Sequence, residues 1–353
     1  MYNITISDIA REAGVSKATV SRVLNNPSIV DRVKRERVRE VIEKYHYQPS
    51  ALARDLSVQK TSTIGILVPE LDNPFFGSIL RGALELFNER NYMVVCFNSD
   101  EKADRDIEAL QDMRSYHYSG LLYTPSIGYM DPEKKKEINR LLDILDVPTV
   151  LMDRNYQDLK RFDAVYFDDF NAMREAASLL ASAGHRKIGL LNSRDSEFLA
   201  RIRRRGYIQG LKESGVPYQK KYDYVIPGYT KEGAYRKACE ILAEDDRPTA
   251  IITGNNDITL GFLSALYEYG MHLSRDCVCI GLDRIEALDI TGVKLDYILR
   301  DGYQLGKKAA KLILSRLKDP SRKTQEVALN YQIVIRNTEA YSTDQIAYSI
   351  GTA

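Results

Sequence analysis

From residue 61 onward, short apolar runs alternate with longer stretches in which apolar residues recur at helical spacing. The separate runs have the length of strands buried on both faces, and the stretches between them have the length of helices. This alternation favours parallel, doubly wound sheets, which bind ligands at the carboxyl ends of their strands. The pattern restarts near His185, so we expect two similar lobes. The predicted strands span 63–69, 92–98, 120–125, 148–153, 187–192, 250–253 and 277–282.

The first fifty residues show a different pattern, with three short apolar-periodic segments that each follow a capping residue. The first contains Asp8 as a capping-box partner and ends at Gly14, and the second ends near "NNP" at 25–27. Two short helices joined by a tight turn with a glycine indicate a helix-turn-helix. The predicted caps are Thr5, Ser16 and Asp31, and the third helix carries Val33, Val38, Val41 and Ile42 and ends near Tyr45.

The second helix, "KATVSRVLN", has two chemically distinct sides. At about 100° per residue, Val20, Val23 and Leu24 gather on one side, which we expect to pack on the other helices. The other side holds a cation, a hydroxyl, an amide and a guanidinium, which suit base edges and phosphates. A solvated polar face is the alternative. The residues on this side are Lys17, Ala18, Ser21, Arg22 and Asn25.

Charge is distributed unevenly along the chain. Residues 1–60 hold 11 Lys and Arg against 7 Asp and Glu, whereas the remainder is slightly acidic, and the whole chain has a net charge of +1. A basic head on an acidic body suggests that the head meets a polyanion. With 353 residues, 44% of them hydrophobic, two or three domains with real cores are expected.

A short segment, "YQPSALARDLSVQKTS", separates head and body. Pro49 and Ser50 can begin a helix that runs to about Ser57, too short to be stable alone. A marginal helix at this place is typical of a segment that folds on binding DNA, where Leu56 can act as a wedge in the minor groove. A plain linker is the alternative.

Three motifs resemble the lactose-repressor (LacI/GalR) family of bacterial transcription regulators. They are "TISDIAREAGVSKATVSRVLNN", "YQPSALARDL" and "IGILVPELDNPFFGSILRGAL". The resemblance extends to about residue 340. It implies that Lys17, Ala18 and Arg22 read bases and that Leu56 opens the central step of a palindromic operator. It implies further DNA contacts at Thr5, Ser16, Thr19, Ser21, Asn25 and Ala51. Where the family usually has Ser and Thr, this chain has Asp31, which can still cap, and Lys34, which can contact phosphate as a cation.

The fold class implied is α/β: an all-α helix-turn-helix head, a short hinge helix, and a two-lobed core like the periplasmic binding proteins, with parallel doubly wound sheets. The effector would lie between the lobes. The expected domains are the head at 1–48, the hinge and linker at 49–61, the first lobe at 62–162 with 291–322, the second lobe at 163–290 with 323–340, and a tail at 341–353.

Candidate effector contacts follow the strands. Phe75 and Phe76 match cleft positions of the family, although they can equally be core of the following helix. Arg203 matches the arginine that binds effector oxygens, and its guanidinium suits sugar diols or a carboxylate. Tyr229 can stack on a ligand ring. The full set is Asn73, Phe75, Phe76, Arg203, Tyr229, Asn256 and Asp283.

Two departures from the family bear on the effector. Asn256 stands where many members have an aspartate that holds sugar hydroxyls, and Arg284 replaces an aspartate in "GLDR". An amide does not repel an anion. A sugar acid or sugar phosphate therefore stands beside a neutral sugar as the expected effector. The extra arginines Arg201, Arg204 and Arg205 are expected on a solvated helix face.

No motif for catalysis, metal or cofactor binding is present. The chain lacks a phosphate-binding loop, and its four histidines and four cysteines are scattered, so we expect no enzyme, no metal site, no cofactor and reduced thiols. We expect no signal peptide, no membrane segment and a cytoplasmic location. The tail lacks heptads, so a homodimer is expected, the minimum for a palindromic DNA site.

The sequence therefore predicts a repressor that binds double-stranded DNA under the control of a small molecule. The alternative is a regulator whose body serves mainly to dock a protein co-regulator, such as a phosphocarrier protein. A transport solute-binding protein fits the body alone and does not explain the head.

Overall fold

The computed structural model describes residues 4–47, 61–194 and 197–337. The chain divides into two compact units, Met1–Thr61 and Ser62–Ala353, and each is treated separately below. None of the described helices is long and apolar enough to cross a membrane.

The first unit is the predicted helix-turn-helix head, made of α1 (Ile6–Glu12), α2 (Lys17–Asn25), the 3₁₀ turn η1 (Pro27–Ile29) and α3 (Arg32–Lys44). All three predicted caps are confirmed. Thr5 and Asp8 form a full capping box, the Ser16 side chain accepts from the Thr19 amide, and Asp31 accepts from the amides of Val33 and Lys34. Each cap satisfies amides that the first helical turn leaves without a partner.

The head buries a small apolar core of Ile9, Ala10, Ala13, Val20, Val23 and Val38. One expected member was wrong, since Val33 is 56% exposed. It lies five positions before Val38, which places it about 140° around the helix from that buried side chain. Val41 and Ile42 pack against the core as expected.

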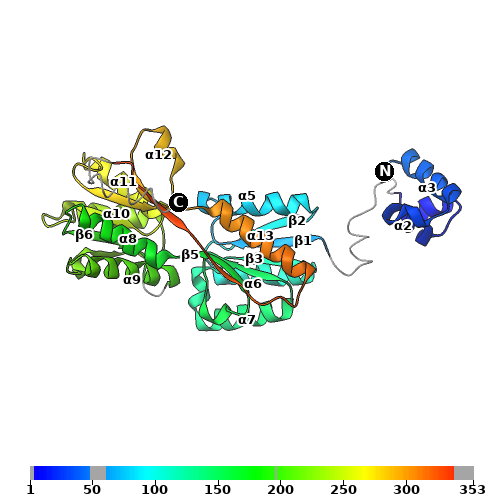
Figure 1. The fold of residues 1–353 in the computed structure, drawn as a ribbon, viewed down its shortest axis with the longest axis horizontal. Coiled ribbons are helices and arrows are strands. Elements are labelled where there is room, and N and C mark those ends of the chain that lie inside the picture. The colour runs from blue at the N-terminus through cyan, green and yellow to red at the C-terminus, as the bar shows by residue number, and fades with distance from the viewer. Residues whose placement is uncertain (1–3, 48–60, 195–196, 338–353) are drawn as a thin grey trace. The chain divides into compact units, whose positions relative to one another are not determined.

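The second unit contains two lobes, each with a six-stranded sheet (Figure 1). In the first lobe the strand order is β11-β5-β4-β3-β1-β2, and every pairing is parallel. The apolar clusters place α5 and α13 against one face and α6 and α7 against the other. The elements are β1 (Thr63–Val68), α5 (Pro74–Glu89), β2 (Met93–Asn98), α6 (Ala103–Ser115), β3 (Gly120–Tyr123), η2 (Ile127–Met130), α7 (Pro132–Leu145), β4 (Thr149–Met152), η3 (Gln157–Leu159), β5 (Asp163–Phe167), α13 (Gly302–Lys318) and β11 (Glu326–Leu329).

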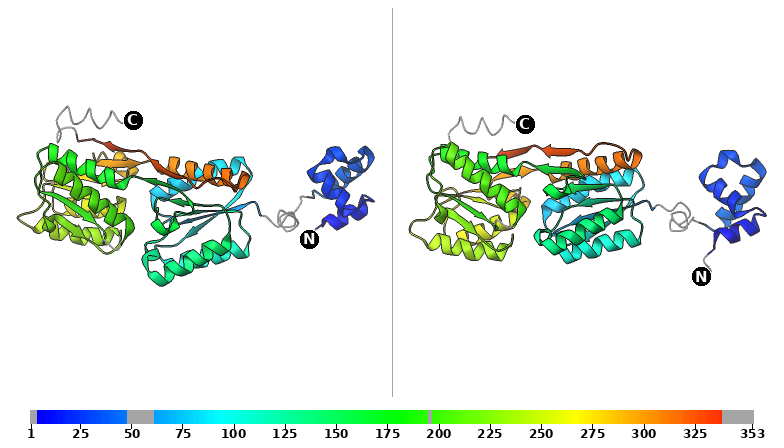
Figure 2. Two further views of the ribbon diagram at one scale, coloured as in Figure 1. Left: turned by 60° about the horizontal axis from the view of Figure 1, so that its bottom comes forward. Right: turned by 90° about the horizontal axis from the view of Figure 1, so that it is seen from below.

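The second lobe has the order β12-β10-β9-β8-β6-β7, with only β12 antiparallel, to β10. Helices α8 and α9 cover one face and α10 and α11 the other. Figure 2 shows the layered arrangement of both lobes from two further directions. The elements are α8 (Asp169–Ser182), β6 (Ile188–Asn192), α9 (Phe198–Glu213), η4 (Lys220–Tyr222), β7 (Asp223–Val225), α10 (Lys231–Ala243), β8 (Ala250–Thr253), α11 (Asn256–Glu268), β9 (Val278–Leu282), α12 (Glu286–Ile290), β10 (Asp296–Arg300) and β12 (Tyr331–Val334).

The chain crosses between the lobes later than predicted. The expected crossings near residues 163, 290 and 322 would place β5 and β11 in the second lobe and β10 in the first. The structure instead pairs β5 and β11 within the first sheet and β10 within the second. The chain therefore crosses after β5, after β10 and between β11 and β12. The error arises because the short strands β5, β10 and β11 were not among the predicted apolar runs.

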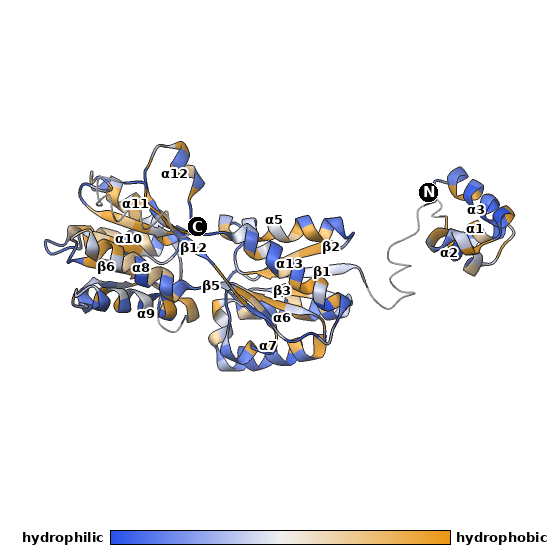
Figure 3. Ribbon diagram, viewed as in Figure 1, coloured by the Kyte–Doolittle hydropathy of each residue, from blue (hydrophilic) through white to orange (hydrophobic). Residues whose placement is uncertain are grey.

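Burial explains why six of the seven predicted strands form, whereas β2, at the edge of its sheet, is only partly buried. Hydrophobic residues gather along the strands and on the helix sides that face them, while charged residues lie on the outer helix surfaces (Figure 3). On α7, for example, Ile138, Leu141, Leu142 and Leu145 are buried at helical spacing. This is the amphipathic pattern of a helix that covers one face of a sheet.

Candidate functional site

The predicted recognition side of α2 faces outward in the head. Lys17, Ala18 and Arg22 are exposed, whereas Val20 and Val23 are buried. The helical-wheel prediction is therefore confirmed for these five residues. A cation and a guanidinium on a helix with exposed small residues can reach base edges in a major groove.

The other candidate DNA contacts surround this helix, and several also stabilise it. The Thr5 hydroxyl donates to Asp8 (2.6 Å), and the hydroxyls of Ser16 and Thr19 lie 2.9 Å apart. Lys34 is exposed in the first turn of α3. Ser21 is half-buried. The side chain of Asn25, and Ala51 and Leu56 with the expected hinge helix, lie outside the described residues.

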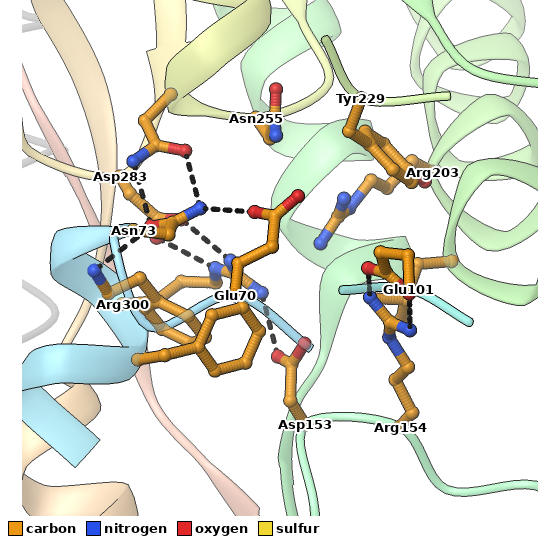
Figure 4. Close-up of a pocket in the computed structure, with 14 residues that line it drawn as sticks. Glu70, Asn73, Glu101, Asp153, Arg154, Arg203, Tyr229, Asn255, Asp283 and Arg300 are labelled. Carbon is orange, nitrogen blue, oxygen red and sulfur yellow. Dashed lines mark hydrogen bonds and ion pairs between the residues drawn. The ribbon is translucent and has the colours of Figure 1, made fainter. Parts of the chain in front are cut away.

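In the body, a pocket lies between the two lobes, at the carboxyl ends of strands from both sheets (Figure 4). Its free volume is about 30 Å³, enough for water but far below the roughly 300–1,000 Å³ of small-molecule sites. The lobes are thus closed on their own side chains. All seven predicted effector residues line it: Asn73, Phe75, Phe76, Arg203, Tyr229, Asn256 and Asp283.

Two buried amides join the lobes across this pocket. Asn73 caps α5 of the first lobe, and Asn256 begins α11 of the second. The Asn73 amide nitrogen donates to Asn256 (3.1 Å), and the Asn256 amide nitrogen donates back (2.9 Å). Each oxygen also accepts a backbone amide, from Phe75 and Asp257 respectively, which fixes how the two amides are oriented.

Arg300 forms the centre of a buried ionic network (Figure 4). It ends β10, where the chain crosses into α13 of the first lobe. Its guanidinium donates to both oxygens of Asp283 (2.9 and 2.7 Å), to Asp153 (3.0 Å) and to Asp169 (3.4 Å). It also lies over the ring of Phe75, 4.3 Å from the centroid. A single cation therefore ties carboxylates of both lobes together.

The two other pocket arginines are also paired with carboxylates. Arg203 contacts Asp169 at 2.7 Å and donates to the Gly254 carbonyl, and its guanidinium lies 5.8 Å from the ring centroid of Tyr229. Arg154 contacts Glu101 in a short bidentate pair. These cations are committed to the protein's own carboxylates.

The pKa values of the acids around the pocket shift in different directions. Burial raises the pKa of Glu70, which accepts from Asn73, and burial also raises the pKa of Glu197. Burial raises the pKa of Asp153 more than Arg300 lowers it. For Asp169 burial is opposed by Arg203 and Arg300, and the pKa falls below its usual value. The site can therefore offer both hydrogen-bond donors and acceptors to a polar ligand.

None of the extra arginines noted in the sequence lines this pocket. Arg284 is exposed, pairs with Asp289 (2.7 Å) and is not among the residues that line the pocket. Arg204 is buried rather than solvated and contacts Asp223 (2.8 Å). Arg201 and Arg205 are exposed on α9, as predicted. The argument for an anionic effector loses the support of Arg284.

Family models match nearly the whole chain. Residues 5–50 match the bacterial regulatory proteins of the lacI family, and residues 61–339 match the periplasmic binding proteins and sugar binding domain of LacI family. The chain belongs to the LacI family. It is a DNA-binding transcriptional regulator with a body of the small-molecule-binding type.

Relatives of this LacI-family chain match it over nearly their full lengths. Catabolite control protein A of Priestia megaterium is 29% identical over 95% of this chain and 99% of its own length. A LacI family transcriptional regulator from Enterococcus faecium with bound ribose is 27% identical, with a TM-score of 0.68 over 78% of this chain and 97% of that one. The lac repressor dimer bound to operator and an anti-inducer shares the fold, with a TM-score of 0.82, 22% identity and coverage of 97% and 100%.

Sequence reasoning missed seven residues that line the LacI-family pocket. Asp153 ends a predicted strand, Arg154 follows it, and Glu70 directly follows another, so the strand-end rule points to them. Arg300 had no such signal, because β10 was not predicted. The missed residues are Glu70, Glu101, Asp153, Arg154, Leu199, Asn255 and Arg300.

Proposed function

We propose that this regulator represses transcription as a homodimer on a palindromic operator in the bacterial cytoplasm. The exposed face of α2 supports this. Lys17, Ala18 and Arg22 would read bases, and two heads related by a twofold axis would place two such helices in successive major grooves. Leu56 would open the central base step of the operator. The remaining candidates would make further DNA contacts: Thr5, Ser16, Thr19, Ser21, Asn25, Lys34 and Ala51.

The effector we propose is a neutral, polyhydroxylated ring such as a sugar. The observation that carries this choice is that all three pocket arginines already have carboxylate partners, Glu101, Asp169 and Asp283. Four carboxylates line the pocket against these three cations. An anion would therefore lose its hydration without gaining a free cation, which is unfavourable.

Aromatic side chains support a ring ligand. Phe75, Phe76 and Tyr229 give the pocket apolar walls, and the Tyr229 hydroxyl is buried with no partner among the described residues. Hydroxyl groups of a sugar can both donate to carboxylates and accept from amides. The Enterococcus relative was solved with ribose, which accords with this class.

A thermal-shift screen of the full chain tests the proposal, using neutral sugars, sugar acids, sugar phosphates and nucleobases. A ligand at 100 times its Kd stabilises the fold by roughly 2.7 kcal/mol. A neutral sugar should raise Tm, and the shift should vanish in Tyr229→Ala and persist in Arg284→Ala. A shift only with acids or phosphates would contradict the neutral class. No shift with any compound would favour control by a docked protein co-regulator.

A further inference from the structure

Acidic side chains of the two lobes face one another across the central pocket. The first lobe supplies Glu70 and Glu101, which line the pocket (Figure 4), and the second supplies Glu197 and Asp257. Carboxylates that are brought close together oppose one another's ionisation. We propose that closing the lobes is coupled to proton uptake by Glu70 and Glu197, so that a fall in pH favours the closed arrangement.

A chain of hydrogen bonds places Glu70 beside the second lobe. The Asn73 amide nitrogen donates to the Glu70 carboxylate (3.2 Å) and to the Asn256 side-chain oxygen (3.1 Å). That oxygen also accepts the backbone N–H of Asp257 (3.1 Å), at the start of α11. Glu70 therefore lies at the boundary between the lobes, where the charge of Asp257 opposes its ionisation.

Glu197 occupies the matching place on the second lobe. It directly precedes α9, and the ring of the next residue, Phe198, lies 4.6 Å from the ring of Tyr156 in the first lobe. Glu197 is only 8% exposed, and its Oε2 has no hydrogen-bond partner among the described residues. An ionised carboxylate buried in this way is unfavourable, and protonation removes most of that cost.

Positive charge near these acids is shared between them. Arg154 acts on both Glu70 and Glu197, but its guanidinium already holds Glu101 in a bidentate pair. Burial, together with the facing carboxylates, raises the pKa of Glu70 and of Glu197 more than the neighbouring donors and cations lower it. The groups that face Glu70 are Asn73, Glu101, Asp257 and Arg154, those that face Glu197 are Ser193, Glu101, Arg154, Arg194 and Tyr229, and Lys231 faces Asp257.

Opening the lobes would separate Glu70 from Asp257 and Glu197 from Glu101, and would return these carboxyls to water. The pKa of each glutamate is therefore higher in the closed arrangement than in an open one, so the closed arrangement binds more protons. The ratio of closed to open chains should rise as pH falls towards the ordinary glutamate pKa of 4.5, by at most about tenfold per pH unit for each glutamate. A consequence for DNA binding rests on the proposed function, whereas the coupling itself does not.

A tryptophan probe measures closure, because the chain has no tryptophan of its own. Phe170→Trp places the probe on α8, where Phe170 lines a cavity that residues of both lobes enclose, so closure shields it from water. In the full chain the emission should shift to shorter wavelength, and quenching by acrylamide should weaken, as pH falls from 8 to 4.5. Ile202→Trp, on the neighbouring helix α9 in the same cavity, repeats the measurement at a second position.

Glutamine at the two positions mimics the protonated side chains. In the probe-bearing chain, Glu70→Gln combined with Glu197→Gln should keep the tryptophan shielded at both ends of the pH range, and each substitution alone should remove part of the pH dependence. Glu89→Gln combined with Glu244→Gln removes two exposed carboxylates, one from each lobe, and should leave the pH dependence unchanged. Thermal melts identify any variant that fails to fold, and either single glutamine variant then suffices.

The proposal is overturned if the emission does not change between pH 8 and 4.5, if the double glutamine variant keeps the full pH dependence, or if the control pair loses it as well. The consequence for DNA is tested by fluorescence anisotropy on DNA selected from a random pool. The DNA affinity of the double glutamine variant should depend less on pH than that of the control pair. Equal dependence overturns the DNA part only. A chain that selects no DNA contradicts the proposed function and leaves the emission result standing.

Discussion

Asn73 and Asn256 lie 183 positions apart in the chain and exchange two amide hydrogen bonds across the interlobe pocket, at 3.1 and 2.9 Å. Because each amide is also held by a backbone N–H, neither can turn without losing a bond. The pair acts as a latch that holds the lobes closed. The family's usual aspartate at the second position could not form it, since a carboxylate has no N–H to donate.

Restoring that aspartate tests the latch. Asn256→Asp removes one hydrogen bond, leaves the buried Asn73 oxygen with one donor fewer and places a charge near Glu70. We expect closure to weaken by about 1–2 kcal/mol. Hydrogen exchange of the peptides that contain residues 73–77 and 255–259 should become faster in the ligand-free full chain. Asn88→Asp, exposed on the same helix as the Asn73 cap, is the control. Equal exchange in both variants would contradict a latch.

The ionic network around Arg300 gives a second prediction. Arg300→Gln leaves Asp283, Asp153 and Asp169 without their shared buried cation. We expect a loss of about 3–5 kcal/mol in the free energy of unfolding. Arg284→Ala removes an exposed arginine that pairs with Asp289, and should cost less than about 1 kcal/mol. Urea denaturation of both variants measures the difference. Similar losses would mean that Arg300 is no more important to the fold than a surface ion pair.

The sequence allows some parts of this structure to be predicted and not others. The head could be predicted almost completely, because caps such as Ser16 and Asp31 act within three residues of the sequence. The seven predicted strands were also recoverable, since each is an apolar run, although β2, at the edge of its sheet, is only partly buried. The pocket residues that follow those strands were found, but Arg300 was not. Its strand, β10, begins with the charged residue Asp296 and resembles a surface segment until its partners β9 and β12 are known.

The prediction of where the chain crosses between the lobes failed for the same physical reason. Strands β5 and β11 are short, and β11 is half-exposed at the edge of its sheet. Their assignment depends on pairing between segments about 160 residues apart, such as Val327 with Val165. Local periodicity carries no signal for such a pairing. The latch between Asn73 and Asn256 was likewise hidden, although both residues were placed in the cleft.

The buried carboxyl of Asp106 predicts a pH dependence of stability. It accepts hydrogen bonds from the Tyr123 hydroxyl and from Ser126, yet burial raises its pKa to about 6, from 3.8 for the ordinary group. Between pH 4 and 6 the native state therefore binds more protons than the unfolded state. This group's contribution to stability is largest below about pH 4 and falls as pH rises to 6, by on the order of 3 kcal/mol.

Asp106→Asn should remove that component, so the free energy of unfolding should fall less steeply between pH 4 and 6 than in the unaltered chain. Asp104→Asn is the matched control, since Asp104 lies on the same helix with 70% of its side chain exposed. Its profile should follow that of the unaltered chain. Denaturant titrations at several pH values provide the comparison. Parallel profiles for both variants would refute a role for Asp106.

Close packing of α5 against α13 leads to the fourth prediction. A Cβ at Gly306 would lie 1.9 Å from the backbone carbonyl oxygen of Ile79, so Gly306→Ala must push the helices apart. We expect a loss of about 1–3 kcal/mol in stability. Gly77→Ala, within α5, meets nothing within 4 Å and should stabilise by about 0.5–1 kcal/mol. Thermal melting separates the two. A neutral Gly306→Ala would show that the helices can shift freely.

The head allows base reading and phosphate binding to be separated. Arg22 is exposed on α2 and Lys34 on α3. Arg22→Ala should relax sequence preference at one base position, at a cost of about 1–3 kcal/mol on the selected site, and leave effector binding intact. Lys34→Ala should weaken binding to all sequences alike and reduce the slope of log affinity against log salt by about 1. Site selection from random DNA followed by anisotropy at several salt concentrations measures both. If Arg22→Ala kept the full sequence preference of the unaltered chain, Arg22 would not be a base-reading residue.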